Sequence, residues 1–129
     1  MNRFLFDTDV IIDYLRGNKL AIEYFESIDG EFHLSAITIA ELYTGLKGEE
    51  ERTQLEYFLS LFNIIPISKE IATEGGLLRQ QWHKSHGTGL ADALIAATAS
   101  SHKMTLISLN EKHFGMLEFF TIPYRKRKK

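Results

Sequence analysis

The stretch that decides the fold reads Arg3-Phe4-Leu5-Phe6-Asp7-Thr8-Asp9-Val10-Ile11-Ile12-Asp13-Tyr14-Leu15. Its apolar start is short enough for one buried strand. From about Asp9 to Arg16 the apolar residues recur at helical spacing, which predicts a helix directly after the strand. A strand that leads into a helix in this way is typical of the first half of a βαβ unit, and such units build parallel sheets.

The same alternation continues along the chain. Short apolar runs predict further strands at 32–35, 63–67, 105–108 and 117–121. Between them, helical spacing of apolar residues predicts helices at 21–28, 38–46, 55–62, 68–82 and 90–101. Strands separated by helices indicate a largely parallel sheet between helical layers. We therefore expect an α/β fold, a three-layer α/β/α sandwich with a central, mostly parallel five-stranded sheet.

Composition narrows the class of protein. The 129 residues are 44% hydrophobic and 25% charged, as in an ordinary globular domain with its own core. The chain has no cysteine, which excludes disulfides, thiolate catalysis and cysteine-bound zinc. No apolar run approaches the roughly 20 residues that span a bilayer, and the N-terminus does not resemble a signal peptide. We expect no membrane association and a cytoplasmic location.

Charge is distributed unevenly. The last five residues, 125–129, are all Lys or Arg, so we divide the chain into a domain at 1–124 and a basic C-terminal tail at 125–129. Taking these five from the 15 basic residues leaves 10 against 17 acidic ones. An acidic body attracts nucleic acid only where metal ions or a local basic patch reverse its field. The tail could be that patch, a solubilising end, or an appended sequence.

Four polar residues stand in apolar frames and carry most of the functional information: Asp7, Glu41, Asp92 and Asn110. Each follows a predicted strand or lies near the start of a predicted helix. In a parallel α/β sheet these positions share one edge, and ligands bind there where the strand order switches. Ionised groups beside apolar surface need a counter-charge, and no Lys or Arg lies within these frames. Oxygen ligands suit hard cations such as Mg²⁺ or Mn²⁺.

Each of these residues also has a simpler interpretation. Asp7 could cap the following helix. Glu41 and Asp92 could be first-turn carboxylates that favour the helix dipole, and Asn110 could be a turn or cap residue. Capping and helix-dipole roles would have to explain all four residues separately, although all four are expected at one edge of the sheet. These roles also leave unexplained why Glu41 and Asp92 are flanked by apolar residues.

Three of these frames match a known family. Residues 6–15, 35–42 and 91–99 resemble PIN-domain ribonucleases, and most closely the VapC-type toxins of toxin–antitoxin pairs. Residues 106–114 are similar to the last motif of that family, and the likeness runs from about residue 2 to residue 120. The four motifs occur in the family's order. The resemblance implies a PIN fold and an Mg²⁺- or Mn²⁺-dependent endoribonuclease.

The resemblance also implies roles for individual residues. Asp7, Glu41 and Asp92 match the acidic metal-binding positions, and Asn110 falls where many members carry a fourth acid, so it would act through water. Three further residues are expected to support the acids: Thr8, Asp9 and Ser35. Thr8 and Ser35 would orient the carboxylates. Asp9 could add a further carboxylate to the site, but capping of a helix is the simpler assignment. Asp13 is expected to pair with Arg16 at i, i+3.

The implied reaction is attack of a metal-activated water on an RNA phosphodiester, leaving a 5′-phosphate and a 3′-hydroxyl. The implied partners are an RNA substrate, a VapB-like antitoxin and a second copy of the chain. Two alternatives stay open: an RNA-processing PIN nuclease without toxicity, and a catalytically silent RNA-binding PIN module. The sequence does not indicate which RNA is cut.

Histidines give weaker signals. His83 and His86 are spaced to chelate zinc, but no third ligand is apparent, so a solvated helix face is the simpler interpretation. His113 could act as an acid or base, yet its neighbour Phe114 favours a packed structural role.

Overall fold

The computed structural model describes residues 2–126 and contains five parallel strands. They are β1 (Arg3–Phe6), β2 (Glu31–Ser35), β3 (Asn63–Ile65), β4 (Thr105–Ile107) and β5 (Phe120–Thr121). Their order across the sheet is β3-β2-β1-β4-β5, with every neighbouring pair parallel. The predicted five-stranded sheet is confirmed, and no described strand is antiparallel. The fifth strand is shorter than predicted, because 117–119 form a turn before it.

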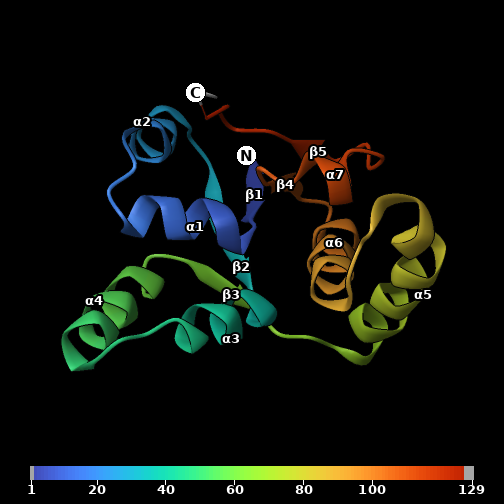
Figure 1. Ribbon diagram of the computed structural model, residues 1–129, viewed down its shortest axis with the longest axis horizontal. Helices are drawn as coiled ribbons and strands as arrows, with labels where there is room; N and C mark the ends of the chain where they lie inside the picture. Colours follow the sequence, from blue (N-terminus) through green and yellow to red (C-terminus); the bar gives the residue numbers. More distant parts are fainter. Residues whose placement is uncertain (1, 127–129) are drawn as a thin grey trace.

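Seven helices surround this sheet in the described chain. They are α1 (Thr8–Leu15), α2 (Lys19–Ser27), α3 (Ala36–Thr44), α4 (Glu49–Leu59), α5 (Lys69–His86), α6 (Leu90–His102) and α7 (Glu111–Phe114). Figure 1 shows α1 to α4 on one side of the strands and α5 to α7 on the other. No helix within residues 2–126 is long and apolar enough to cross a membrane.

Two cores lie on opposite faces of the sheet, because successive side chains of a strand point to opposite faces. Phe6 belongs to the core that includes α1, α3 and α4, and its ring stacks on Phe25 at 4.6 Å between centroids. Leu5, its neighbour in β1, belongs to the second core with Ile95 of α6 and Leu106 of β4. This arrangement is the predicted three-layer α/β/α sandwich.

Helices α5 and α6 cross very closely. A Cβ atom built on Gly75 would lie 2.7 Å from Leu94 Cδ2 and 3.2 Å from Leu94 Cα, so any larger residue would force Leu94 to shift. Helix α5 ends at Gly87, which takes the left-handed conformation (φ 69°) that glycine adopts most readily. The chain therefore turns sharply after α5. Helix α6 begins three residues after Gly87, and Asp92 lies in its first turn.

The C-terminal segment folds back onto the domain. Tyr124 Oη donates to Asp13 Oδ2 at 2.8 Å, and Lys126 Nζ lies 2.9 Å from Asp13 Oδ1. The expected pairing of Asp13 with Arg16 is therefore wrong, because Tyr124 and Lys126 bind the two oxygens of Asp13 instead. Arg125 contacts Glu111 at 3.4 Å between exposed side chains. Residues 127–129 of the predicted tail lie outside the described residues.

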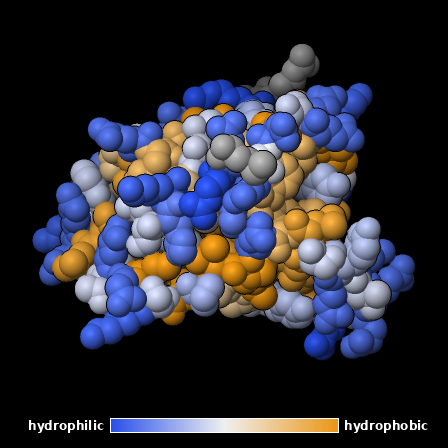
Figure 2. Space-filling model, turned by 180° about the vertical axis from the view of Figure 1, so that it is seen from behind, coloured by the Kyte–Doolittle hydropathy of each residue, from blue (hydrophilic) through white to orange (hydrophobic). Residues whose placement is uncertain are grey.

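Apolar side chains also reach the surface. In Figure 2 they gather in a band between hydrophilic rims. The large hydrophobic residues with the most exposed surface are Tyr57, Leu61 and Leu77, each at least 60% exposed. A single exposed apolar residue is ordinary, so these residues alone define no binding surface.

Candidate active site

The site is centred where the sheet reverses its order, between β1 and β4. Strands β2 and β3 lie on one side of β1, and β4 and β5 on the other. Asp7 follows β1 directly, and its backbone N–H donates to Ile107 O of β4 at 2.8 Å. Ser108 follows β4 at the same edge. Crevices at such switch points are where open α/β sheets bind ligands.

Asp7 is almost fully buried, with 6% of its surface exposed. Its Oδ1 accepts from Thr8 N at 2.8 Å, and its Oδ2 accepts from Ser108 Oγ at 2.7 Å. Asp7 thus caps α1, as the simpler interpretation proposed. The cap uses only one of its oxygens, and the hydroxyl of Ser108 fixes the other. Both bonds hold the carboxylate in one orientation.

Asp9 lies beside Asp7 in the first turn of α1, so the expectation that Asp9 caps a helix is wrong. Its Oδ2 accepts from Leu109 N at 3.1 Å, and Ser108 Oγ lies 3.4 Å away. Its Oδ1 is buried and has no hydrogen-bond partner. A buried carboxylate oxygen without a partner is costly, and a cation would relieve that cost.

Burial raises the pKa of the Asp7 carboxyl to about 7, and the negative charges of Asp9 and Asp92 add to the effect. The hydrogen bonds from Ser108 and Thr8 oppose this rise only in part. Burial likewise raises the pKa of Asp9 to about 6, with the hydrogen bond from Leu109 opposing and Asp13 adding. No Lys, Arg or His in residues 2–126 forms an ion pair with Asp7 or Asp9.

Glu41 reaches the site through Thr8. The Thr8 hydroxyl donates to Glu41 Oε1, and it lies 3.2 Å from the hydroxyl of Thr38. The expected first-turn position of Glu41 is wrong, because α3 begins at Ala36 and Glu41 lies in its second turn. Ser35 caps α3 by accepting from Ile37 N at 3.1 Å, and within residues 2–126 no hydrogen bond joins its hydroxyl to a site carboxylate, so the expectation that it orients one is wrong.

Asp92 lies on the opposite side of the site, in the first turn of α6. Its Oδ2 accepts from Gly89 N at 3.3 Å and lies 2.8 Å from His113 Nδ1. Asn110 caps α7: its Oδ1 accepts from His113 N at 3.2 Å. Its amide Nδ2 lies 2.9 Å from His113 Nδ1. Asn110 is therefore linked to Asp92 through a histidine.

The sequence does not single out Ser108, and it does not pair His113 with Asp92. A signal for Ser108 was present, because a hydroxyl residue directly after a strand lies at the same edge as Asp7. His113 is a possible acid or base from its side chain, but its buried neighbour Phe114 favours a packed role, and no local pattern points to Asp92.

A metal ion fits the donors of this site in kind. The pKa values of the Asp7 and Asp9 carboxyls are both raised, and the negative charge of Asp92 adds to the rise at Asp7. No group of three or more His, Asp or Glu side chains in residues 2–126 is arranged to hold an ion by itself. Mg²⁺ does not require such a cage, since it usually keeps several waters and binds through one or two carboxylates and substrate phosphates.

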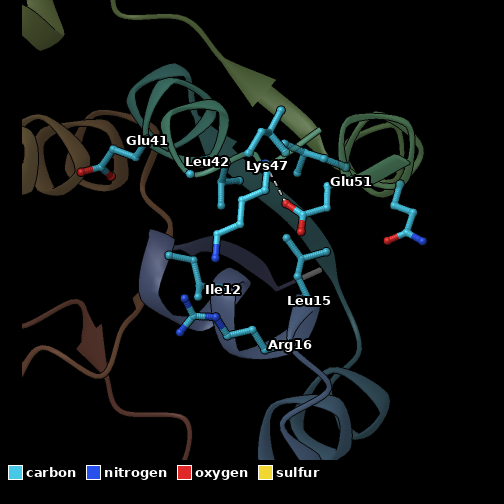
Figure 3. Close-up of a pocket in the computed structure, with 11 residues that line it drawn as sticks. Ile12, Leu15, Arg16, Glu41, Leu42, Lys47 and Glu51 are labelled. Carbon is cyan, nitrogen blue, oxygen red and sulfur yellow. Dashed lines mark hydrogen bonds between the residues drawn. The ribbon is translucent and has the colours of Figure 1, made fainter. Parts of the chain in front are cut away.

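A groove of about 290 Å³ adjoins the site between α1, α3 and α4. Its apolar lining consists of Ile12, Leu15, Leu42, Leu46 and Leu55. Arg16 and Lys47 extend toward each other across it, as Figure 3 shows. Glu41 lies at one end with its carboxylate directed away from these two cations. The groove is thus lined by apolar side chains, by these two cations and by Glu51, and it shares Glu41 with the acidic site.

Comparison with known proteins agrees with this geometry. The PIN domain family matches residues 4–117. The chain belongs to the PIN domain family. Among its relatives, Ribonuclease VapC10 of Mycobacterium tuberculosis is 36% identical over 93% of this chain and 92% of the relative. Ribonuclease VapC19 of the same organism is 35% identical, over 93% and 98%.

A solved toxin–antitoxin complex from Klebsiella pneumoniae contains a chain similar in structure, with a TM-score of 0.85 and 35% sequence identity. The match covers 95% of this PIN-domain chain and 98% of that chain. The resemblance stated from the four sequence motifs is therefore confirmed at the level of the family and the fold.

Proposed function

We propose that this PIN-domain protein is an Mg²⁺- or Mn²⁺-dependent endoribonuclease of the VapC type, a toxin inhibited by a cognate antitoxin. The observation that carries the proposal is the buried pair Asp7 and Asp9, which has no cationic partner among the described residues. Such a pair is costly in a protein that only needs to fold. It is useful in a protein that binds a divalent cation.

Asp7 and Asp92 would hold the ion, with Glu41 on the side of α3. When bound, the ion lowers the pKa of a coordinated water and offsets charge that develops on the phosphate. Ser108 and the N–H of Thr8 keep Asp7 fixed, so that carboxylate needs little reorganisation when the ion arrives. Thr8 holds one oxygen of Glu41 and leaves the other toward substrate or water.

The antitoxin would bind in the groove between α1, α3 and α4. The apolar lining suits an amphipathic segment of a VapB-like partner, and Arg16 and Lys47 suit acidic side chains on it. Because Glu41 lies at the end of the groove, a segment seated there could also place a basic side chain beside the acidic site. We also propose that the protein acts as a homodimer in the cytoplasm.

The test is cleavage of total RNA by the purified protein. With Mn²⁺ we expect discrete new ends that carry a 5′-phosphate and a 3′-hydroxyl, and with EDTA we expect none. Asp7→Asn is the matched control. It replaces one carboxylate oxygen by an amide nitrogen, removes the negative charge and should abolish cleavage. Equal cleavage by this variant would refute the proposal, and binding without cleavage would favour a silent RNA-binding module.

Expression in a bacterial host separates a toxin from a processing nuclease. A toxin should arrest growth, Asp7→Asn should relieve the arrest, and co-expression of a neighbouring antitoxin-like gene should relieve it as well. RNA cleavage in vitro without growth arrest would favour the processing nuclease.

A further inference from the structure

His113 lies directly behind one of the proposed metal-binding carboxylates. Its Nδ1 is 2.8 Å from Asp92 Oδ2, with about a quarter of each side chain exposed. The same oxygen accepts from Gly89 N at 3.3 Å. Two donors therefore share Oδ2, and Oδ1 is the oxygen of Asp92 that stays available to an ion.

The backbone of His113 is held from two sides. Asn110 Oδ1 accepts from its N–H at 3.2 Å, and Thr88 Oγ1 donates to its carbonyl oxygen at 2.9 Å. Thr88 is buried, with 2% of its surface exposed. Phe114, the next residue, is fully buried in the core. The loop after α5 and the start of α7 thus both hydrogen-bond to the backbone of His113.

The imidazole ring is confined as well. A Cβ atom on Gly87 would come within 3.4 Å of His113 Nε2, so the loop passes close to that edge of the ring. His83 Nδ1 lies 3.1 Å from Thr88 O and ties the same loop to α5. The loop thus lies against the Nε2 edge of the ring, on the side away from the Nδ1 that faces Asp92.

One contact requires a choice of hydrogen position. His113 Nδ1 lies near both Asp92 Oδ2 and Asn110 Nδ2, and one ring nitrogen cannot donate to the first and accept from the second. We assign the hydrogen to Nδ1, so that it donates to the Asp92 carboxylate, which is the shorter of the two contacts. Asn110 then acts on His113 through the backbone bond of its Oδ1.

We propose that His113 is a positioning residue that orients the Asp92 carboxylate toward the metal ion. The inference rests on the proposed function, because it presumes that Asp92 binds the ion. Groups that orient a metal ligand typically contribute 10- to 100-fold in metal affinity. His113 would therefore act on metal binding, and Asn110 and Thr88 would act by holding His113.

The test is calorimetric titration of the purified full-length protein with Mn²⁺ in the absence of RNA. His113→Leu keeps a bulky side chain but removes the donor, and we expect the Kd for Mn²⁺ to rise about 10- to 100-fold. His113→Asn places an amide N–H donor where Nδ1 stands and should recover most of the affinity. His86→Leu is the matched control, since His86 contacts Ser85 and Trp82 but no carboxylate.

Cleavage assays add a second readout that a merely structural role would not move. In His113→Leu, the Mn²⁺ concentration for half-maximal cleavage should rise with the Kd, while kcat at saturating Mn²⁺ stays close to that of the wild type. If His113→Leu fails to fold, Thr88→Val replaces it, because it removes the hydroxyl that holds the His113 carbonyl. We expect a smaller rise in Kd for this variant.

Different outcomes test the role of His113 and the proposed nuclease function. An unchanged Mn²⁺ Kd in His113→Leu, or in Thr88→Val where it is used, would overturn the role of His113 even if stability falls. Failure of His113→Asn to recover affinity would overturn it too. A wild-type protein that neither binds Mn²⁺ nor cuts RNA would instead refute the proposed function.

Discussion

Replacing Asp7 by Asn should stabilise the metal-free protein while it abolishes cleavage. The pKa of Asp7 rises from its ordinary value of 3.8 to about 7 on folding, chiefly through burial. Because the folded chain holds the proton more tightly, the neutral form contributes stability that is complete below about pH 4 and is lost as the pH rises through 7. Asn imitates that neutral form at every pH.

The magnitude follows from the two pKa values. At 1.36 kcal/mol per pKa unit, ionising Asp7 at pH 8 costs the folded protein about 4 kcal/mol relative to the unfolded chain. At pH 5 the same cost falls to less than about 2 kcal/mol. Asn can also keep both hydrogen bonds, since its Oδ1 can accept from Thr8 N and its Nδ2 can donate to Ser108 Oγ.

The assay is urea unfolding in EDTA at pH 8 and at pH 5. With an m-value of about 2 kcal/mol per molar, the midpoint of Asp7→Asn should exceed that of the wild type by up to about 2 M at pH 8. At pH 5 the difference should shrink to less than half. Mn²⁺ at about 100 times its Kd should stabilise the wild type alone, by about 2.7 kcal/mol. A variant less stable than the wild type at pH 8, or an advantage that does not depend on pH, would refute the reasoning.

Two further predictions concern packing and the site. Gly75→Ala should lower the free energy of unfolding by about 1–3 kcal/mol in urea titrations, because its Cβ would collide with Leu94. Gly76→Ala, where the same atom meets open space, should instead raise it by about 0.5–1 kcal/mol, and equal effects would contradict the close crossing. Ser108→Ala should raise the pKa of Asp7 further, because the hydroxyl that stabilises its ionised form is lost. Calorimetry at pH 7 should then show weaker Mn²⁺ binding, and an unchanged Kd would argue against Asp7 as a ligand.

The sheet and its layers could be predicted from the sequence because each strand is a short apolar run and each helix shows helical spacing. Asp7 was placed at the correct edge for the same reason, since it follows the first run directly. Glu41 was placed one turn too early. The apolar spacing predicts a helix that begins near Thr38. In the structure α3 begins at Ala36, because Ser35 at the end of β2 caps it.

Contacts between residues far apart in the sequence could not be predicted. Asp13 appeared to have a partner three residues away, but its partners Tyr124 and Lys126 lie at the other end of the chain. His113 was interpreted as a packed residue, whereas Phe114 is packed and His113 turns to Asp92. Such contacts depend on the tertiary packing of segments that are far apart in the sequence, and no local sequence pattern predicts that packing.

The central claim is that Asp7 and Asp92 together bind a divalent cation, and anomalous scattering from crystals grown with Mn²⁺ tests it most directly. We predict one strong Mn²⁺ peak within about 2.0–2.4 Å of an oxygen of each carboxylate. This range extends from the usual Mg²⁺–oxygen distance to the short end of the Ca²⁺–oxygen distances. The peak should be absent from Asp7→Asn crystals. A peak elsewhere, or an unchanged peak in the variant, would contradict the account.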